Sequence, residues 1–122
     1  MSIELTSDED FQTQVFDFTD PEKWTSRGTI PAIVDFHAPW CAPCKMLSPV
    51  LESVEKDFGG HLRVFKVNID FLKKATEALG IQSIPSLLYL PVGRPIQGSM
   101  GAVSRTQLLK NIKEHLGLEL PV

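Results

Sequence analysis

The feature that most constrains the fold is a short, almost unbroken apolar run in the first third of the chain. It reads Ala32-Ile33-Val34-Asp35-Phe36, and Pro31 and Pro39 bound it on either side. A strand that is apolar on both faces is typical of the centre of a sheet that helices cover on both sides. We therefore predict a central strand at 32–36, with Asp35 as its one charged residue.

Strand and helix patterns alternate along the rest of the chain. The other predicted strands are 3–5, 62–69, 87–90 and 96–100. The predicted helices follow Thr6 and cover 41–58, 71–79 and 104–117. Because Pro95 cannot donate a ladder hydrogen bond, we expect the strand at 96–100 at a sheet edge. The order joins a βαβ half to a closing hairpin, which predicts an α/β fold with a central mixed β-sheet of about five strands flanked by about four helices.

Capping patterns locate some of the helix ends. Thr6 and Glu9 have the spacing of a capping box, with Thr6 as the N-cap, and Ser104 begins a similar pattern for the last helix. Pro49 falls inside the helix at 41–58 and should kink it. The first helix is expected to present an apolar stripe of Phe11, Val15 and Phe18.

Length and composition exclude several classes of protein. A chain of 122 residues fits a single domain over 1–122. A net charge of −3, without a long Lys/Arg cluster, argues against a nucleic-acid surface. No apolar run approaches the roughly 20 residues that a membrane span needs. The first residues lack the basic start and apolar stretch of a signal peptide, which favours the cytoplasm; an exported, periplasmic location stays open if a signal has been removed.

Cys41 and Cys44 are the only cysteines and are separated by two residues. A disulfide that closes so short a loop removes little entropy from the unfolded chain, so the pair suits electron exchange better than structural stabilisation. At the predicted start of a helix, unpaired N–H groups and the helix dipole would favour a thiolate on Cys41. Cys44, a turn further on, should be more buried. Half of a zinc site is the alternative, but zinc needs four ligands and His37, His61 and His115 are scattered.

Four segments of the chain closely resemble thioredoxins. They are Val34 to Lys45 (with Trp40-Cys41-Ala42-Pro43-Cys44-Lys45), Lys66 to Asp70, Gly80 to Ser86, and Gly101-Ala102. The resemblance implies a thioredoxin fold and a protein-disulfide reductase. Cys41 would attack a substrate disulfide, and Cys44 would then attack Cys41 and release the reduced substrate. It also implies that no cofactor is bound beyond the redox-active Cys41–Cys44 disulfide.

The same resemblance implies the partners: disulfide-containing client proteins, and a flavin- and NADPH-dependent thioredoxin reductase that recharges the chain. The expected state is a monomer. Two other functions remain open, namely an exported thiol–disulfide oxidase or isomerase, and a thioredoxin-fold binding or chaperone module. Pro43 favours the reductase, since a histidine there would stabilise the reduced form and make an oxidant. Ala42 departs from the glycine that is usual in the family.

Asp35 and Lys66 are candidate proton-handling residues. A carboxylate in an apolar strand should be buried, with a raised pKa, and would suit the transfer of the Cys44 proton. A strand-end aspartate that faces water is the alternative. Lys66, in the next predicted strand, could reach Asp35 and tune it, or could be an ordinary surface lysine.

A rim around Cys41 is the candidate substrate-binding surface. The resemblance implies that Pro85 is cis and faces the cysteines; a plain trans turn is the alternative. Trp40 could instead be a core residue. The proposed rim consists of Trp40, Pro43, Ile84, Pro85, Gly101 and Ala102.

Two features differ from the commonest thioredoxin pattern. His37 stands where an aromatic or small residue is more usual, and could either respond to pH or be packed and neutral. The segment 17–31 is longer than in compact thioredoxins and carries Trp24. It could form a partner surface, or Trp24 could cover the sheet edge or helix ends.

Overall fold

The computed structural model describes residues 2–120, and its centre is one mixed β-sheet. The strands are β1 (Ile3–Leu5), β2 (Ala32–His37), β3 (Arg63–Asn68), β4 (Ser86–Leu90) and β5 (Gln97–Met100). Their order across the sheet is β1-β3-β2-β4-β5. The pairs β1–β3 and β2–β3 are parallel, whereas β4 runs antiparallel to β2 and to β5. The predicted mixed sheet and the edge position of β5 are both confirmed.

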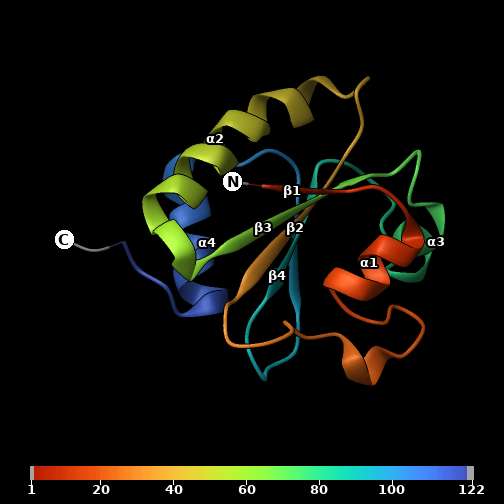
Figure 1. Ribbon diagram of the computed structural model, residues 1–122. Helices are drawn as coiled ribbons and strands as arrows, with labels where there is room; N and C mark the ends of the chain where they lie inside the picture. The colour runs from red at the N-terminus through yellow and green to blue at the C-terminus, as the bar shows by residue number, and fades with distance from the viewer. Residues whose placement is uncertain (1, 121–122) are drawn as a thin grey trace.

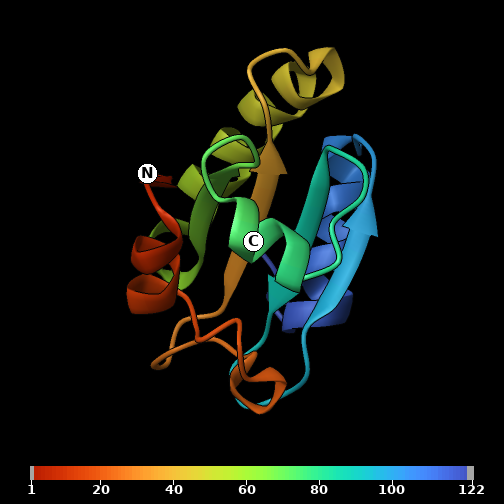
Figure 2. The ribbon, with the colours of Figure 1, turned by 90° about the vertical axis from the view of Figure 1, so that its right-hand side faces the viewer.

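Helices cover both faces of the sheet (Figure 1). They are α1 (Asp8–Gln14), α2 (Ala42–Phe58), α3 (Lys73–Ala78) and α4 (Arg105–Leu116), with short 3-10 turns at Pro21–Lys23 and Gly59–His61. Figure 2 looks onto the face that α1 and α3 cover, with α2 and α4 behind the sheet. None of the helices between residues 2 and 120 has the length and apolar content of a bilayer-spanning segment.

The apolar core is divided into two layers by the sheet. Val34 and Phe36 pack in the cluster on the α1/α3 side, whereas Ile33 packs with residues of α2 and α4. Because side chains alternate between the faces of a strand, Asp35 and His37 point to the same side as Ile33. The central strand thus places its one carboxylate under α2.

The first helix differs from the prediction in its start and its end. Ser7, not Thr6, is the N-cap: its Oγ accepts the Asp10 N–H at 3.0 Å. Asp10 in turn accepts the N–H of Thr6, the residue before the N-cap, at 3.0 Å, so the reciprocal bond of a capping box is made one residue before the cap. The helix ends at Gln14, and Val15 and Phe18 are buried beyond it rather than on its stripe.

The third helix also starts later than predicted. It begins at Lys73, because Phe71 and Leu72 first form a turn whose N–H groups both donate to the Asn68 carbonyl. Phe71 is exposed. The fourth helix begins as predicted, with Ser104 as N-cap accepting from the Gln107 N–H at 3.1 Å.

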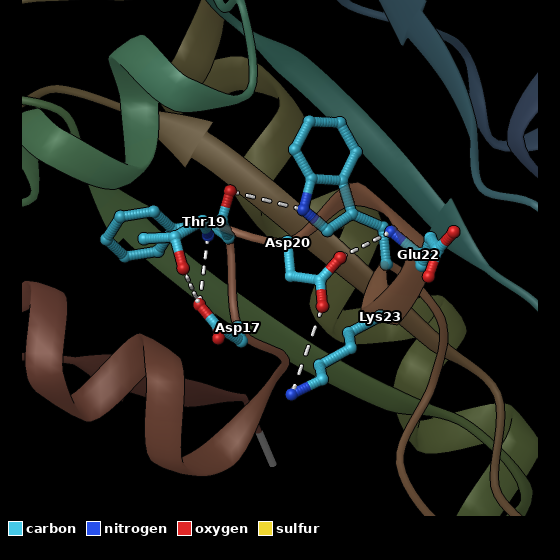
Figure 3. A network of polar contacts seen from close by, with 7 residues as sticks. Asp17, Thr19, Asp20, Glu22 and Lys23 are labelled. Carbon is cyan, nitrogen blue, oxygen red and sulfur yellow. Dashed lines mark hydrogen bonds and ion pairs between the residues drawn. The ribbon is translucent and has the colours of Figure 1, made fainter.

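The segment after α1 folds back onto the core (Figure 3). Asp17 accepts two hydrogen bonds from Thr19, and Asp20 caps the short turn that follows by accepting the Glu22 N–H at 3.1 Å. Trp24 stacks on Phe16, with ring centroids 5.9 Å apart. Trp24 is half-buried and packs against the core cluster on the α1/α3 side.

Candidate active site

The cysteine pair lies where the central strand leads into the longest helix. Cys41 is the N-cap of α2, and its Sγ accepts the Cys44 backbone N–H at 3.3 Å. The two residues are joined by a disulfide, with Cα atoms 5.3 Å apart. An N-cap group faces the unpaired N–H groups of the first turn and the positive end of the helix dipole. This position favours negative charge on Cys41 once the disulfide is reduced.

Both cysteines are largely covered in the disulfide form. Cys41 is 6% exposed and Cys44 is 5% exposed, and both pack with Ala38, Ile69 and Ile84. The expectation that Cys44 is clearly the more buried of the two is therefore not met in this redox state. The difference between them is one of position: Cys41 occupies the helix terminus, and Cys44 lies inside the first turn.

The loop that carries Pro85 contacts the cysteines from the other side of the site. The Ile84–Pro85 peptide bond is cis, Ile84 packs against the pair, and Pro85 is buried. The Pro85 carbonyl accepts the Gly101 N–H at 2.8 Å, which ties the two loops together. Ala102 is exposed and is not part of the buried cluster around the cysteines.

Trp40 and Pro43 are exposed on either side of Cys41. Trp40 is 67% exposed, which excludes the core alternative. Its Nε1–H donates to Asp70 Oδ2 at 3.1 Å. Asp70 is itself oriented by its N–H, which donates to Asn68 Oδ1 at 2.9 Å. The large apolar ring next to the disulfide is thus held at the surface by a polar contact at its edge.

Asp35 is buried under α2, so the alternative of an aspartate that faces water is excluded. It is only 1% exposed, and its Oδ1 has no hydrogen-bond partner among the described residues. Burial disfavours the charged form and raises the pKa of Asp35 from 3.8 to about 6. The positive charges of His37 and Lys66 oppose the rise, and the negative charge of Glu4 adds to it.

A row of charged residues crosses three strands beside Asp35. Glu4 on β1 is in register with Lys66 on β3, and Lys66 is in register with Asp35 on β2. The Lys66 Nζ donates to Ser48 Oγ of α2 at 2.6 Å, so it lies on the same face as Asp35. At the end of β2, His37 Nε2 is 3.3 Å from Glu4 Oε2.

Glu4 and Ser48 are the members of this group that the sequence patterns do not indicate. Glu4 belongs to a three-residue strand, and the alternation in Ile3-Glu4-Leu5 shows only that it faces away from its neighbours. Its pairing partner is far away in sequence, at Lys66. Within residues 2–120, no group of three or more His, Cys, Asp or Glu side chains is placed to hold a metal ion.

A helix that is N-capped by a cysteine and has a second cysteine in its first turn, preceded by a central strand with a buried carboxylate, defines a thiol–disulfide exchange protein. Comparison with known proteins gives the family. The family model described as Thioredoxin matches residues 3–114. The chain belongs to the thioredoxin family and carries out thioredoxin-type dithiol–disulfide exchange, with its own disulfide as the redox group.

Individual relatives support this assignment. The chain is 39% identical over 117 residues to a thioredoxin from Borreliella burgdorferi, covering 96% of this chain and 99% of the relative. It is 37% identical over 92 residues to a thioredoxin from Bacillus subtilis, covering 75% and 86%. Its fold is similar to the crystal structure of a thioredoxin from Malassezia sympodialis, with a TM-score of 0.74 at 25% identity, over 94% of this chain and 90% of the other.

Proposed function

We propose that this chain is an electron donor that reduces disulfides in client proteins, with Cys41 as the nucleophile and Cys44 as the resolving thiol. The observation that carries the proposal is the position of Cys41 as the N-cap of α2, where the helix terminus stabilises a thiolate. The thiolate is the species that attacks a disulfide.

The proposed cycle has two exchange steps. In the first, the Cys41 thiolate attacks one sulfur of the client disulfide, a Cys41–client bond forms, and the other client sulfur leaves as a thiolate. In the second, the Cys44 thiol gives up its proton and attacks the Cys41 Sγ. The Cys41–client bond breaks, the second client sulfur leaves, and the Cys41–Cys44 disulfide forms. The client has then gained two electrons and the cysteine pair has lost two.

Asp35 is the proposed acceptor of the Cys44 proton. It is on the face of the sheet that α2 covers, and Cys44 lies in the first turn of that helix. A carboxyl group with a pKa of about 6 exchanges protons readily near neutral pH. Lys66 is proposed to act on Asp35 through its charge, since its ammonium group bonds to Ser48.

The proposed client-binding rim combines exposed and half-buried residues around the disulfide. Trp40 and Pro43 are exposed, and Ile84 and Gly101 are half-buried beside the cis Pro85. Such a surface suits an extended client segment that is recognised by apolar contact and main-chain hydrogen bonds. Ala102, also exposed, is proposed to contact clients at its outer margin.

An electron donor must itself be kept reduced. Membership of the family implies a reductase partner in general terms. We propose a flavin- and NADPH-dependent thioredoxin reductase in this role. The cytoplasm is the compartment we propose, because thiols are kept reduced there.

Trapping the mixed disulfide tests the order of the two cysteines. Cys44→Ser should accumulate a covalent complex with a disulfide-containing protein such as insulin, because the resolving thiol is missing. Cys41→Ser should accumulate none. Mass spectrometry of a tryptic digest identifies the cysteine that carries the adduct. An adduct formed through Cys44 as readily as through Cys41 would contradict the assignment.

The direction of electron flow is tested separately, by equilibrating the pair with glutathione buffers. A donor should show a potential near that of reducing thioredoxins, about −270 mV, whereas an oxidase would lie near −120 mV. A value at the oxidising end would overturn the proposed direction and leave the exchange chemistry intact.

A further inference from the structure

The strongest feature that the proposed cycle does not use is the pair formed by His37 and Glu4. His37 Nε2 and Glu4 Oε2 are 3.3 Å apart, and the side chains are 19% and 56% exposed. His37 follows Asp35 by two residues on β2, so both point to the α2 side of the sheet. Glu4 reaches the same side from β1. A titratable, partly exposed pair therefore lies on the same face of the sheet as the buried carboxylate.

Water reaches this corner of the molecule through a surface hollow of about 680 Å³. The residues that line it are Ser2, Glu4, Glu52, Glu55, Lys56 and Lys66. Lys66 is the register neighbour of Asp35 and also lines the hollow.

Charged groups near Asp35 come from three strands and from α2. β1 contributes Glu4, β2 contributes His37 and β3 contributes Lys66. From α2, Glu52, Glu55 and Lys56 line the hollow, and Cys44 lies in the first turn. β4 presents the apolar Leu87 in register with Asp35. Histidine is the side-chain type whose charge ordinarily changes near neutral pH.

We propose that His37, held by Glu4, is a positioning residue for proton transfer: its charge controls the ionisation of the neighbouring Asp35 and so sets the pH below which disulfide exchange slows. The inference rests on the proposed role of Asp35 as acceptor of the Cys44 proton. His37 acts through Asp35 and does not itself contact the reacting sulfurs.

The sign of the effect follows from the charges. A positive His37 favours the carboxylate form of Asp35, and Glu4 opposes it. Only the carboxylate can accept the Cys44 proton, so a charged His37 extends fast exchange to lower pH. Replacing the histidine leaves the negative charge of Glu4 uncompensated. The acidic limb of the rate profile, where the exchange rate falls with falling pH, then moves to higher pH. Replacing Glu4 moves the acidic limb to lower pH.

The test compares rate profiles of His37→Gln, Glu4→Gln and the double variant, in protein-disulfide reduction from pH 5 to 9. We expect the acidic limb to move up by about half a pH unit in His37→Gln and down by a similar amount in Glu4→Gln. The double variant should lie between them. His61→Gln is the matched control, because His61 is an exposed histidine remote from the row, and its profile should not move.

Repeating the comparison in the Asp35→Asn variant separates this inference from the proposed role of Asp35, on which it rests. In Asp35→Asn, the contribution of Asp35 to the acidic limb should be lost, which leaves the ionisation of Cys41, and His37→Gln should cause no further shift. An acidic limb that stays at the same pH in both His37→Gln and Glu4→Gln would overturn the inference. A shift caused by His37→Gln that persists in Asp35→Asn would also overturn it. If Asp35→Asn keeps the wild-type limb, the proton role of Asp35 fails first. Glu4→Gln keeps the test usable if His37→Gln unfolds, since Glu4 is the more exposed partner.

Discussion

At the scale of single residues, Asp35 combines a cost in stability with a use in chemistry. A carboxyl group whose pKa is raised by burial is more easily protonated in the folded chain than in the unfolded chain. Between pH 3.8 and about 6 the folded state therefore holds more of this proton. Stability must fall as the pH rises through that window and must stay reduced above it.

Replacing the carboxyl group should recover this stability. We expect Asp35→Asn to raise the free energy of unfolding at pH 8 by about 3 kcal/mol, and the gain should shrink to nearly zero around pH 3. Urea denaturation at a series of pH values measures it. The exposed carboxylate variant Glu77→Gln is the control and should show no comparable pH dependence. A gain of equal size at both extremes would mean that the effect of Asp35 is not electrostatic.

Trp40 is a residue of the surface and not of the core, so its removal should affect binding more than folding. We expect Trp40→Ala to lower kcat/KM for a protein disulfide roughly tenfold, as for an aromatic group at the centre of an interface. A small aromatic disulfide, which does not extend along the rim, should lose much less. Asp70→Asn weakens the Trp40 Nε1 contact and should give an intermediate loss. Equal losses with both substrates would place Trp40 in the chemistry instead of the rim.

At the scale of elements, the shifted cap of α1 can be tested directly. We expect Ser7→Ala to lower the free energy of unfolding by about 1 kcal/mol, because the Asp10 N–H loses its acceptor. Thr6→Ala should cost less, since the Thr6 Oγ–Asp10 contact is longer, at 3.3 Å, and exposed. Thermal unfolding of the two variants under one condition compares them. The larger loss in Thr6→Ala would restore the cap that the sequence pattern favoured.

The elements themselves could be predicted because their patterns are local. The apolar run of β2, the helical spacing in α2 and Gly117 at the end of α4 each lie within one segment. The ends were harder to predict. Thr6 and Ser7 both carry a hydroxyl that can cap, and the choice depends on which one the chain aims at the helix. Phe71 and Leu72 fit a helical pattern, yet the Asn68 carbonyl holds them in a turn.

At the scale of the whole molecule, the site divides into a part that the sequence predicts and a part that it does not. Cys41, Cys44 and Asp35 lie in one segment, where strand and helix patterns already place them. The row Glu4–Lys66–Asp35 depends on two parallel pairings between distant strands. Parallel partners have no shared turn to set their register, so the neighbours of Asp35 become visible only in the assembled sheet. Family resemblance supplied Lys66, but it offered nothing for Glu4.

The same sheet has two open edges, and their form bears on whether the chain associates with itself. β1 has only three residues, and β5 is a four-residue strand with Pro95 shortly before it. Short edge strands and nearby proline disfavour edge-to-edge pairing. The only two cysteines are paired with each other, so no thiol is left to link two chains while the disulfide is closed. A net charge of −3 adds weak repulsion.

We therefore expect a monomer in solution. A compact chain of 122 residues should have a radius of gyration of about 14 Å. Small-angle scattering should give this value at every concentration in both redox states. The double variant Cys41→Ser, Cys44→Ser is the control, since no disulfide link can form in it. A radius that rises with concentration in that variant would point to pairing of sheet edges or of the apolar rim, and a rise confined to the wild-type chain under oxidation would point to disulfide links between chains.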